Sequence, residues 1–360
     1  MDKYIDYYND SKKVTYHEQT DISNILKLRA VLKTLPDFCK DYFRAMDPLT
    51  TTKTRISYAY DIRIFFQFLL DENPAFKDYS MKDFTVDVLD QLKAIDIEEY
   101  QEYLKVYKNG DKTETNGERG LKRKISALRS FYAYYYKHEF IQTNPTVLVD
   151  VPKTHEKNII RLDADEVAML LDHIEHCGDE LTGQKRVYYE KTKERDLAIV
   201  TLLLGTGIRV SECVGLDVED VDFKNNGIKV TRKGGNEMVV YFGEEVEHAL
   251  KKYLEVRKNI VPVAGHEHAL FYSTQRKRIG IQAVENLVKK YAGAITTTKK
   301  ITPHKLRSTY GTTLYQETGD IYLVADVLGH RDVNTTKKHY AAMDDARRRK
   351  AATAVHLRED

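Results

Sequence analysis

A stretch without regular spacing of apolar residues divides this chain and constrains its fold more than any other feature. Residues 144–158 contain Pro145 and Pro152 and show little periodicity, as is typical of an extended linker. A chain of 360 residues is long enough for two or three domains, each with its own core. We therefore place a domain boundary here, with the linker itself over residues 146–158.

The part before the linker is predicted to be entirely helical. Apolar residues recur at helical spacing in three segments, the second of which stops at Asn109-Gly110. These segments are residues 51–70, 97–107 and 121–136. We assign residues 48–145 to one helical domain. Residues 1–47 form a helical extension, which is either an accessory arm or an extra pair of helices packed on that domain.

The part after the linker, residues 159–360, is predicted to combine helices with a β-hairpin and to end in a C-terminal tail. Asp163 followed by Glu166 predicts a capped helix start, and alternation on both sides of Gly234-Gly235 predicts a hairpin over 227–241. A short strand is expected at 270–272. Further helices are expected up to 176 and at 195–204, 244–256, 281–291, 303–317, 320–328 and 343–355. The predicted fold class is mainly α with a small β-sheet in the second domain.

Composition narrows the class of protein. Hydrophobic residues make up 42% of the chain, but no apolar stretch approaches the length of about 20 residues that a membrane span needs. The N-terminus has no signal-peptide pattern, so we expect a cytoplasmic protein. The three cysteines are far apart and odd in number, which argues against a disulfide framework. His173, His176 and Cys177 lack the fourth ligand and the usual spacing of a zinc site, so no metal is expected.

Charge is distributed unevenly along the chain. The net charge is only +2, from 57 basic and 55 acidic residues, so DNA binding cannot be inferred from overall charge. Acidic residues are concentrated over residues 83–102, which we expect to face away from DNA. Basic side chains on two helices of the first domain are suited to phosphate contacts, although a solvated charged face is the alternative. These candidate DNA-binding residues are Lys53, Arg55, Lys122 and Arg129.

A tyrosine near the end of the chain follows a series of basic residues. In order they are Arg209, Lys233, His304, Arg307 and His330, and the tyrosine is Tyr340. Cleaving a phosphodiester without a metal requires cations for the developing charge, an acid for the leaving oxygen and a nucleophile. The planar guanidinium groups of Arg209 and Arg307 suit two nonbridging phosphate oxygens. Glu212 is expected to orient Arg209 or its neighbours rather than to react.

The motifs around these residues carry a family resemblance. Arg209 lies in Gly205-Thr-Gly-Ile-Arg-Val-Ser-Glu212, the next pair forms His304-Lys-Leu-Arg307, and His330 ends Leu328-Gly-His330. Tyr340 follows a Thr-Thr pair in Asn334-Thr-Thr-Lys-Lys-His-Tyr340. With these motifs in this order, the chain resembles the tyrosine recombinase (phage integrase) family over roughly residues 50–350.

The resemblance implies a fold and a mechanism. It implies a helical core-binding domain and a mixed α/β catalytic domain that form a C-shaped clamp on DNA. Lys233 on the hairpin would protonate the leaving 5′ oxygen, with Arg232 as the competing candidate, and His330 would hydrogen-bond the phosphate. Attack by Tyr340 would give a 3′-phosphotyrosine and a free 5′ hydroxyl. Because that bond stores the energy for rejoining, no cofactor is expected.

The same resemblance implies partners. Strand exchange joins ends from two duplexes and needs four active sites, so we expect a homotetramer on a double-stranded recombination site, a Holliday junction, and possible accessory DNA-bending or directionality proteins.

Two alternative functions stay open. A type IB topoisomerase uses similar chemistry to relax supercoils, and an architectural DNA-binding protein would not cleave at all. Next in line as nucleophile after Tyr340 are Tyr310, Tyr315 and Tyr322.

Overall fold

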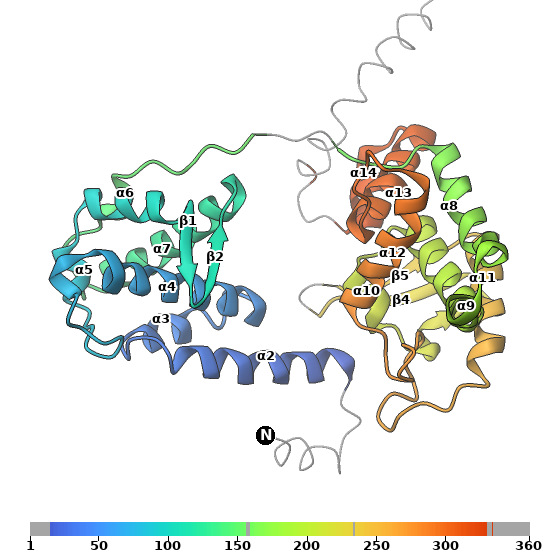
Figure 1. Cartoon of the computed structure of the whole chain (residues 1–360), viewed down its shortest axis with the longest axis horizontal. Helices are drawn as coiled ribbons and strands as arrows, with labels where there is room; N and C mark the ends of the chain where they lie inside the picture. Colours follow the sequence, from blue (N-terminus) through green and yellow to red (C-terminus); the bar gives the residue numbers. More distant parts are fainter. Residues whose placement is uncertain (1–14, 156–158, 233–234, 330–332, 334–360) are drawn as a thin grey trace, which may run out of the picture. The chain divides into compact units, whose positions relative to one another are not determined.

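The chain folds into two compact units, residues 1–157 and 158–360 (Figure 1). The computed structural model describes residues 15–155, 159–232, 235–329 and 333. Helices dominate both units, and two small antiparallel sheets accompany them. The predicted class, mainly α with a small sheet in the second domain, is confirmed. No helix among the described residues is long and apolar enough to cross a membrane.

The N-terminal unit is a set of helices around one core. Phe131 lies at its centre and packs edge-on against Tyr42 and Phe66, with ring centroids 5.2 and 6.2 Å apart. Leu28 and Cys39, from the first 47 residues, belong to the same core. The helices are α2 (Tyr16–Leu32), α3 (Cys39–Ala45), α4 (Thr52–Glu72), α5 (Val88–Gln91), α6 (Ala94–Tyr103) and α7 (Glu118–Lys137), with 3-10 turns η1 (Pro74–Phe76) and η2 (Pro145–Val147).

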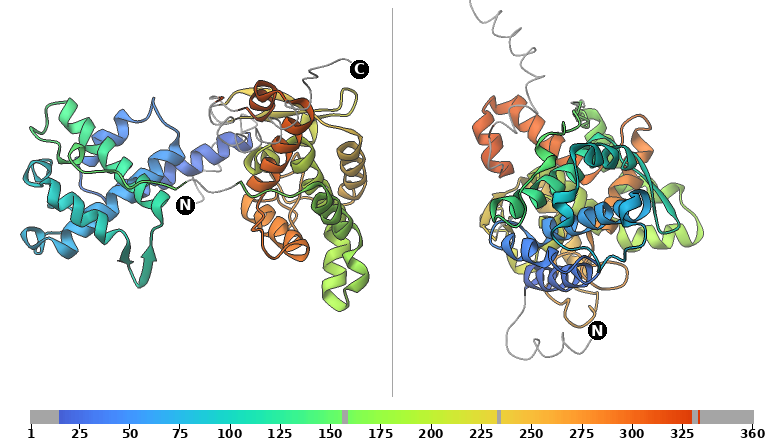
Figure 2. Two further views of the ribbon diagram at one scale, coloured as in Figure 1. Left: turned by 90° about the horizontal axis from the view of Figure 1, so that it is seen from above. Right: turned by 90° about the vertical axis from the view of Figure 1, so that its left-hand side faces the viewer.

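The prediction that this unit is all-helical is wrong at one hairpin. The second predicted helix ends at Tyr103, and β1 (Val106–Asn109) pairs antiparallel with β2 (Lys112–Thr115). Gly110, at a φ of +62°, makes the tight turn that the preceding Asn favours. Every side chain of β2 is exposed, so no alternation of apolar residues marked the strand. The hairpin projects from the helices of its unit (Figure 2).

The first residues of the predicted linker pack on the N-terminal unit. Thr146 and Val149 are buried. Arg129 of α7 donates from Nε to the carbonyl of Thr146 at 3.1 Å and from Nη2 to the carbonyl of Val149. Gln101 of α6 adds a hydrogen bond of 2.9 Å to the carbonyl of Asp150. These contacts fix this backbone, which has few partners of its own.

The C-terminal unit is built around one long helix. α9 (Gly183–Thr206) contacts α8, α11 and α13, and its second half is almost wholly buried. Sequence spacing predicted this helix only from residue 195, because its first turns are polar and exposed. The other helices are α8 (Ala164–His176), α10 (Val210–Gly215), α11 (Glu244–Arg257), α12 (Ile281–Ile295), α13 (Pro303–Thr318) and α14 (Ile321–Leu328), with 3-10 turns η3 (Cys177–Glu180) and η4 (Val218–Asp220).

Two local predictions for this unit are confirmed and one is wrong. The main-chain N–H of Asp163 donates to Glu166 at 2.8 Å in a capping box at the start of α8. The predicted hairpin forms within a sheet of β3 (Val221–Asp222), β4 (Gly227–Thr231) and β5 (Glu237–Tyr241). The strand predicted at 270–272 is reduced to an isolated bridge at Tyr272, because the N–H of Tyr272 donates to the hydroxyl of Tyr253 and its carbonyl accepts from Nη1 of Arg195.

Candidate active site

Arg209 is placed by a sharp turn between two helices. α9 ends at Gly207, whose φ of +62° is in the left-handed region that favours glycine. Two residues later, Arg209 caps the start of α10, and its main-chain N–H donates to the carboxylate of Glu212 at 2.8 Å. Nη1 of Arg209 donates to the same carboxylate at 2.7 Å. Glu212, whose side chain is 3% exposed, therefore orients Arg209, as expected from the sequence.

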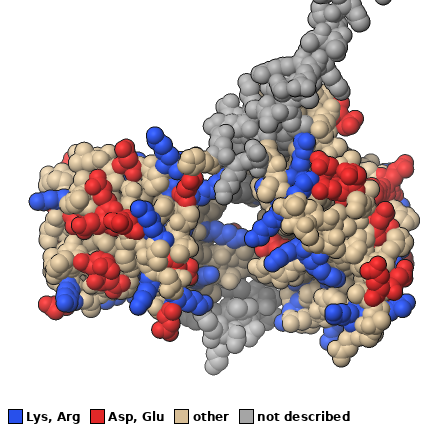
Figure 3. Space-filling view, turned by 45° about the horizontal axis from the view of Figure 1, so that its top comes forward, with Lys and Arg blue, Asp and Glu red and all other residues tan. Residues whose placement is uncertain are grey.

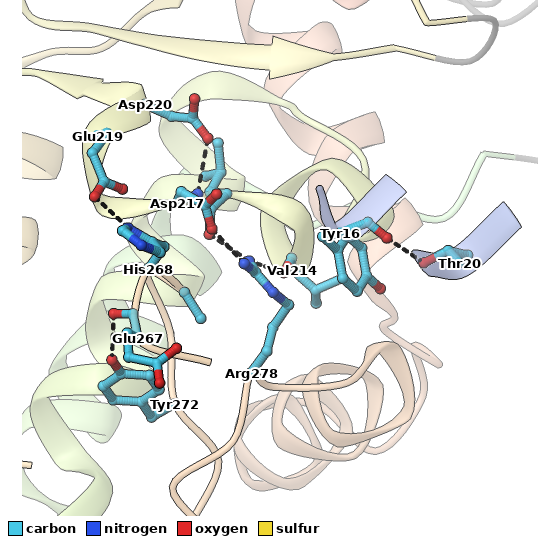
Figure 4. A network of polar contacts seen from close by, with 12 residues as sticks. Tyr16, Thr20, Val214, Asp217, Glu219, Asp220, Glu267, His268, Tyr272 and Arg278 are labelled. Atoms are coloured by element: carbon cyan, nitrogen blue, oxygen red, sulfur yellow. Dashed lines mark hydrogen bonds and ion pairs between the residues drawn. The ribbon is translucent and has the colours of Figure 1, made fainter. Parts of the chain in front are cut away.

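The far end of α10 is anchored separately (Figure 4). Arg278 donates from Nη1 to the carbonyls of Val214 and Leu216, at 3.1 and 2.7 Å, and from Nη2 to the carboxylate of Asp217. A guanidinium at a helix C-terminus also interacts favourably with the helix dipole. The short helix α10, which Arg209 caps, is thus held at both ends.

Arg307 joins the C-terminal ends of two other helices. It lies in α13 and is 4% exposed. Its Nη1 donates to the carbonyl of Gly207, just after α9, and its Nη2 donates to the carbonyl of Leu328, the last residue of α14. Both acceptors are orphan carbonyls at negative ends of helix dipoles, which stabilises a buried cation.

Arg232, the residue after β4, is the third guanidinium in this region. Its Nη2 donates to the carbonyl of Val327 at 2.7 Å. Burial lowers its pKa; neighbouring Arg209 lowers it further, and Glu212 opposes both. An arginine keeps its charge at any working pH, so Arg232 adds a cation beside Arg209. The sequence singled it out only as an alternative to Lys233.

The three arginines converge on one turn of main chain. Arg232, Arg307 and Arg209 donate to the successive carbonyls of Val327, Leu328 and Gly329. The last of these hydrogen bonds is 3.3 Å long. Gly329 closes α14 with a φ of +59°, and the next residue in the sequence is His330. Cations from the start of α10, from just after β4 and from α13 therefore meet where the chain leads into His330.

The remaining predicted catalytic residues are placed only in part. His304 lies in the first turn of α13 and is exposed, whereas Arg307 on the next turn is buried. Lys233, His330 and Tyr340 lie outside the described residues. The structure thus brings together Arg209, Arg307 and Glu212, adds Arg232 to them, and places His304 on the helix that carries Arg307.

Comparison with known proteins decides the family. The model of the phage integrase family matches residues 160–347. The chain is 33% identical over 315 residues to tyrosine recombinase XerC of Caldanaerobacter subterraneus subsp. tengcongensis, covering 84% of this chain and 82% of the relative. It is 31% identical over 338 residues to tyrosine recombinase XerS of Lactococcus lactis subsp. cremoris, covering 88% and 93%. This chain belongs to the phage integrase family. It is a site-specific tyrosine recombinase of the Xer-like kind.

Solved structures of other members share its fold. The integrase of transposon Tn1549, in complex with circular intermediate DNA, aligns with a TM-score of 0.60 at 21% identity, over 84% of this chain and 94% of that one. The XerH recombinase bound to its difH substrate aligns with a TM-score of 0.59 at 21% identity, over 84% and 79%. The integrase fold therefore extends over most of this chain.

The four candidate DNA-binding residues of this integrase differ in what surrounds them. Lys53 and Lys122 are exposed. Arg55 is 12% exposed and forms an ion pair with Asp47 at 2.5 Å, while Arg129 holds the main chain of residues 146–149. Basic and acidic side chains are mixed over the face drawn in Figure 3. Lys53 and Lys122 are thus the better placed of the four to meet a phosphate.

The described residues of this integrase contain no group of three His, Cys, Asp or Glu side chains that could hold a metal ion. His173 and His176 lie in the last turn of α8, near the negative end of the helix dipole. Basic residues are favoured at this end of a helix, which accounts for the position of both histidines.

Proposed function

We propose that this integrase cuts and rejoins double-stranded DNA at recombination sites through a 3′-phosphotyrosine on Tyr340 and a Holliday junction, acting as a homotetramer. The observation that supports this most is the pair Arg209 and Arg307, fixed beside the turn that leads to His330. The DNA-bound structures of the Tn1549 integrase and of XerH support DNA as the partner.

The two arginines supply a preorganised site for the phosphate. Arg209 reaches solvent, since its side chain is 36% exposed, while Glu212 fixes its orientation from the buried side. Arg307 is held rigidly by two carbonyls. A guanidinium has five N–H donors in a planar fork, which suits it to bind a nonbridging phosphate oxygen. Cations fixed before the reaction stabilise the charge that develops in the transition state without reorganising.

The proton and the nucleophile come from residues assigned by sequence. Tyr340 forms a bond from its oxygen to phosphorus, and the bond from phosphorus to the 5′ oxygen breaks. Lys233 gives that oxygen a proton, His304 takes the phenolic proton of Tyr340 near neutral pH, and His330 hydrogen-bonds the phosphate. The 5′ hydroxyl of another strand then attacks the phosphotyrosine, which reverses the proton transfers and needs no cofactor.

A plasmid assay tests the proposal. A binding site is first selected from a pool of random-sequence DNA, and two copies are placed on a supercoiled plasmid. We expect recombinant products and, at early times, Holliday junctions that contain one strand exchanged from each site. A protein that relaxes the plasmid but never forms junctions would act as a type IB topoisomerase, and a protein that binds without cleaving would contradict the catalytic proposal.

A further inference from the structure

We propose that Arg232 is a positioning residue for strand cleavage, which fastens the turn that carries Lys233 to the C-terminal end of α14. This inference rests on the proposed function, because it requires Lys233 to be the acid for the leaving oxygen. In this role Arg232 acts through its neighbour in the sequence and not by its own contact with DNA or the reacting atoms.

The main chain of Arg232 closes the β4–β5 turn. Its N–H donates to the carbonyl of Asn236 at 2.8 Å, and its carbonyl accepts from the N–H of Gly235 at 3.0 Å. Its side chain leaves the turn in another direction and reaches Val327, 95 residues later in the sequence. One residue therefore connects the hairpin, through main chain and side chain, to α14.

The contact with α14 is close-packed. A Cβ added to Gly329 would lie 1.1 Å from Nη1 of Arg232 and 2.2 Å from its Cζ. The guanidinium thus occupies the space in which any other residue at position 329 would place its side chain. The glycine at this position serves both its positive φ and the passage of Arg232. A guanidinium over the last turn of α14 is also favoured by the helix dipole.

Stability alone does not account for this arrangement. Among the described residues, Nε and Nη1 of Arg232 have no hydrogen-bond partner although both atoms are buried. Burying an unsatisfied donor destabilises the folded protein. Arg209 lies near enough to repel it, and burial lowers the pKa of Arg232 itself. A cation kept at such a cost beside the predicted acid points to a role in the reaction.

The role we assign is to hold the hairpin in register with the phosphate site. Arg209 and Arg307 donate to the same turn of α14 as Arg232, so the turn is a common reference for all three. Lys233 follows Arg232 directly. Fixing residue 232 limits the positions that the next side chain can take, and a displacement of about 1 Å from the reacting geometry can cost on the order of 10²-fold in rate.

The test uses a substrate that needs no acid. Single-turnover cleavage by the full chain is measured on DNA with the ordinary 5′ oxygen and on DNA with sulfur at that bridging position. With sulfur, the Tyr340 oxygen bonds to phosphorus, the phosphorus–sulfur bond breaks, and the electron pair leaves on sulfur as a thiolate without a proton. The variants are Arg232→Ala, Arg232→Lys and Lys233→Ala, and Arg276→Ala is an exposed arginine control.

We expect Arg232→Ala to slow cleavage of the oxygen substrate on the order of 10²-fold. With the sulfur substrate, its rate and that of Lys233→Ala should return to within about tenfold of wild type. Arg232→Lys keeps a donor for the carbonyl of Val327, so its defect with the oxygen substrate should be smaller. The sulfur substrate should also rescue it. Arg276→Ala should match wild type on both substrates.

The outcomes separate the two proposals. If sulfur rescues Lys233→Ala but not Arg232→Ala, Arg232 acts on the phosphate or on folding, and the positioning role is overturned while the proposed function stands. If Arg232→Ala cleaves the oxygen substrate at the wild-type rate, the positioning role is likewise overturned. If sulfur fails to rescue Lys233→Ala, Lys233 is not the acid. The positioning role of Arg232 is then overturned, and so is the acid assignment within the proposed function.

Discussion

The orientation of Arg209 depends on a carboxylate that follows it by one helical turn. Glu212 accepts from both the main chain and the guanidinium of Arg209, and it offsets the charge of Arg232 as well. A phosphate in the site would add negative charge beside this buried carboxylate. Glu212 therefore serves the site through orientation, and its own charge is balanced by two arginines.

Replacing Glu212 by Gln tests this dependence. The amide keeps an oxygen for the main-chain N–H but loses the charge, so Arg209 is oriented less firmly. We expect cleavage to slow on the order of 10²-fold. The free energy of unfolding should fall by about 1–3 kcal/mol, below the range for fully buried pairs, because Arg209 reaches solvent. Single-turnover cleavage and urea unfolding measure the two effects.

The matched control is Glu219→Gln, which removes an exposed carboxylate paired with His268 in the same unit. It should leave both measurements near wild type. Equal losses in the two variants would mean that charge in this unit, and not the orientation of Arg209, sets the rate.

Individual residues of the site were predictable to different degrees. Arg209, Glu212 and Arg307 stand in recognisable motifs, so the sequence named them. Their partners were not predictable, because the carbonyls of Gly207 and Leu328 become available only where the ends of α9 and α14 meet. Arg232 carries no motif of its own, and its place beside Gly329 depends on that same tertiary contact.

At the scale of elements, the end of α9 sets the geometry of the site. Gly207 closes this helix, and its carbonyl accepts from Arg307. A Cβ at this position would lie 2.3 Å from Cδ1 of Tyr310 and 3.0 Å from Cδ2 of Leu328. The tight packing of α9, α13 and α14 is therefore possible only with glycine here.

Gly207→Ala should accordingly destabilise the protein. A positive φ costs a non-glycine residue about 1–2 kcal/mol, and overpacking adds about 1–3 kcal/mol. We expect the thermal midpoint and the cleavage rate to fall together, because Arg307 loses its fixed acceptor. Gly293→Ala in α12 is the control, since a Cβ there meets nothing within 4 Å. It should be neutral or stabilising by up to about 1 kcal/mol, and a similar loss in both variants would contradict the packing argument.

Elements with apolar periodicity were predicted well, and polar elements were missed. α7 and α12 have strong amphipathic patterns and lie where the sequence placed them. Strand β2 and the first turns of α9 are exposed and largely polar, so their conformation is set by backbone preferences and turn residues. The strand predicted at 270–272 is absent for the opposite reason. Its residues are apolar, but the main chain of Tyr272 forms hydrogen bonds with the side chains of Tyr253 and Arg195.

At the scale of the molecule, affinity for DNA must come from local charge, since the net charge is only +2. Lys53→Gln with Lys122→Gln removes the two exposed lysines of the basic helices. If each contacts a phosphate, the slope of log affinity against log salt should fall by about 1.8, with similar weakening on all sequences. Filter binding over a range of salt concentrations measures the slope.

The control for charge is Glu98→Gln with Glu99→Gln, two exposed residues of the acidic stretch. This variant should keep the wild-type slope. The same change of slope in both variants would show that the lysines act through overall charge and not through phosphate contacts.

The nucleophile is tested on a suicide DNA substrate whose cleaved end diffuses away, so that a covalent intermediate accumulates. Tyr340→Phe keeps the aromatic ring and loses only the attacking oxygen. We expect it to bind the selected site as tightly as wild type and to form no denaturant-resistant protein–DNA adduct, while wild type accumulates the adduct. An adduct that persists in Tyr340→Phe would contradict the assignment of Tyr340 and direct attention to Tyr310, Tyr315 or Tyr322.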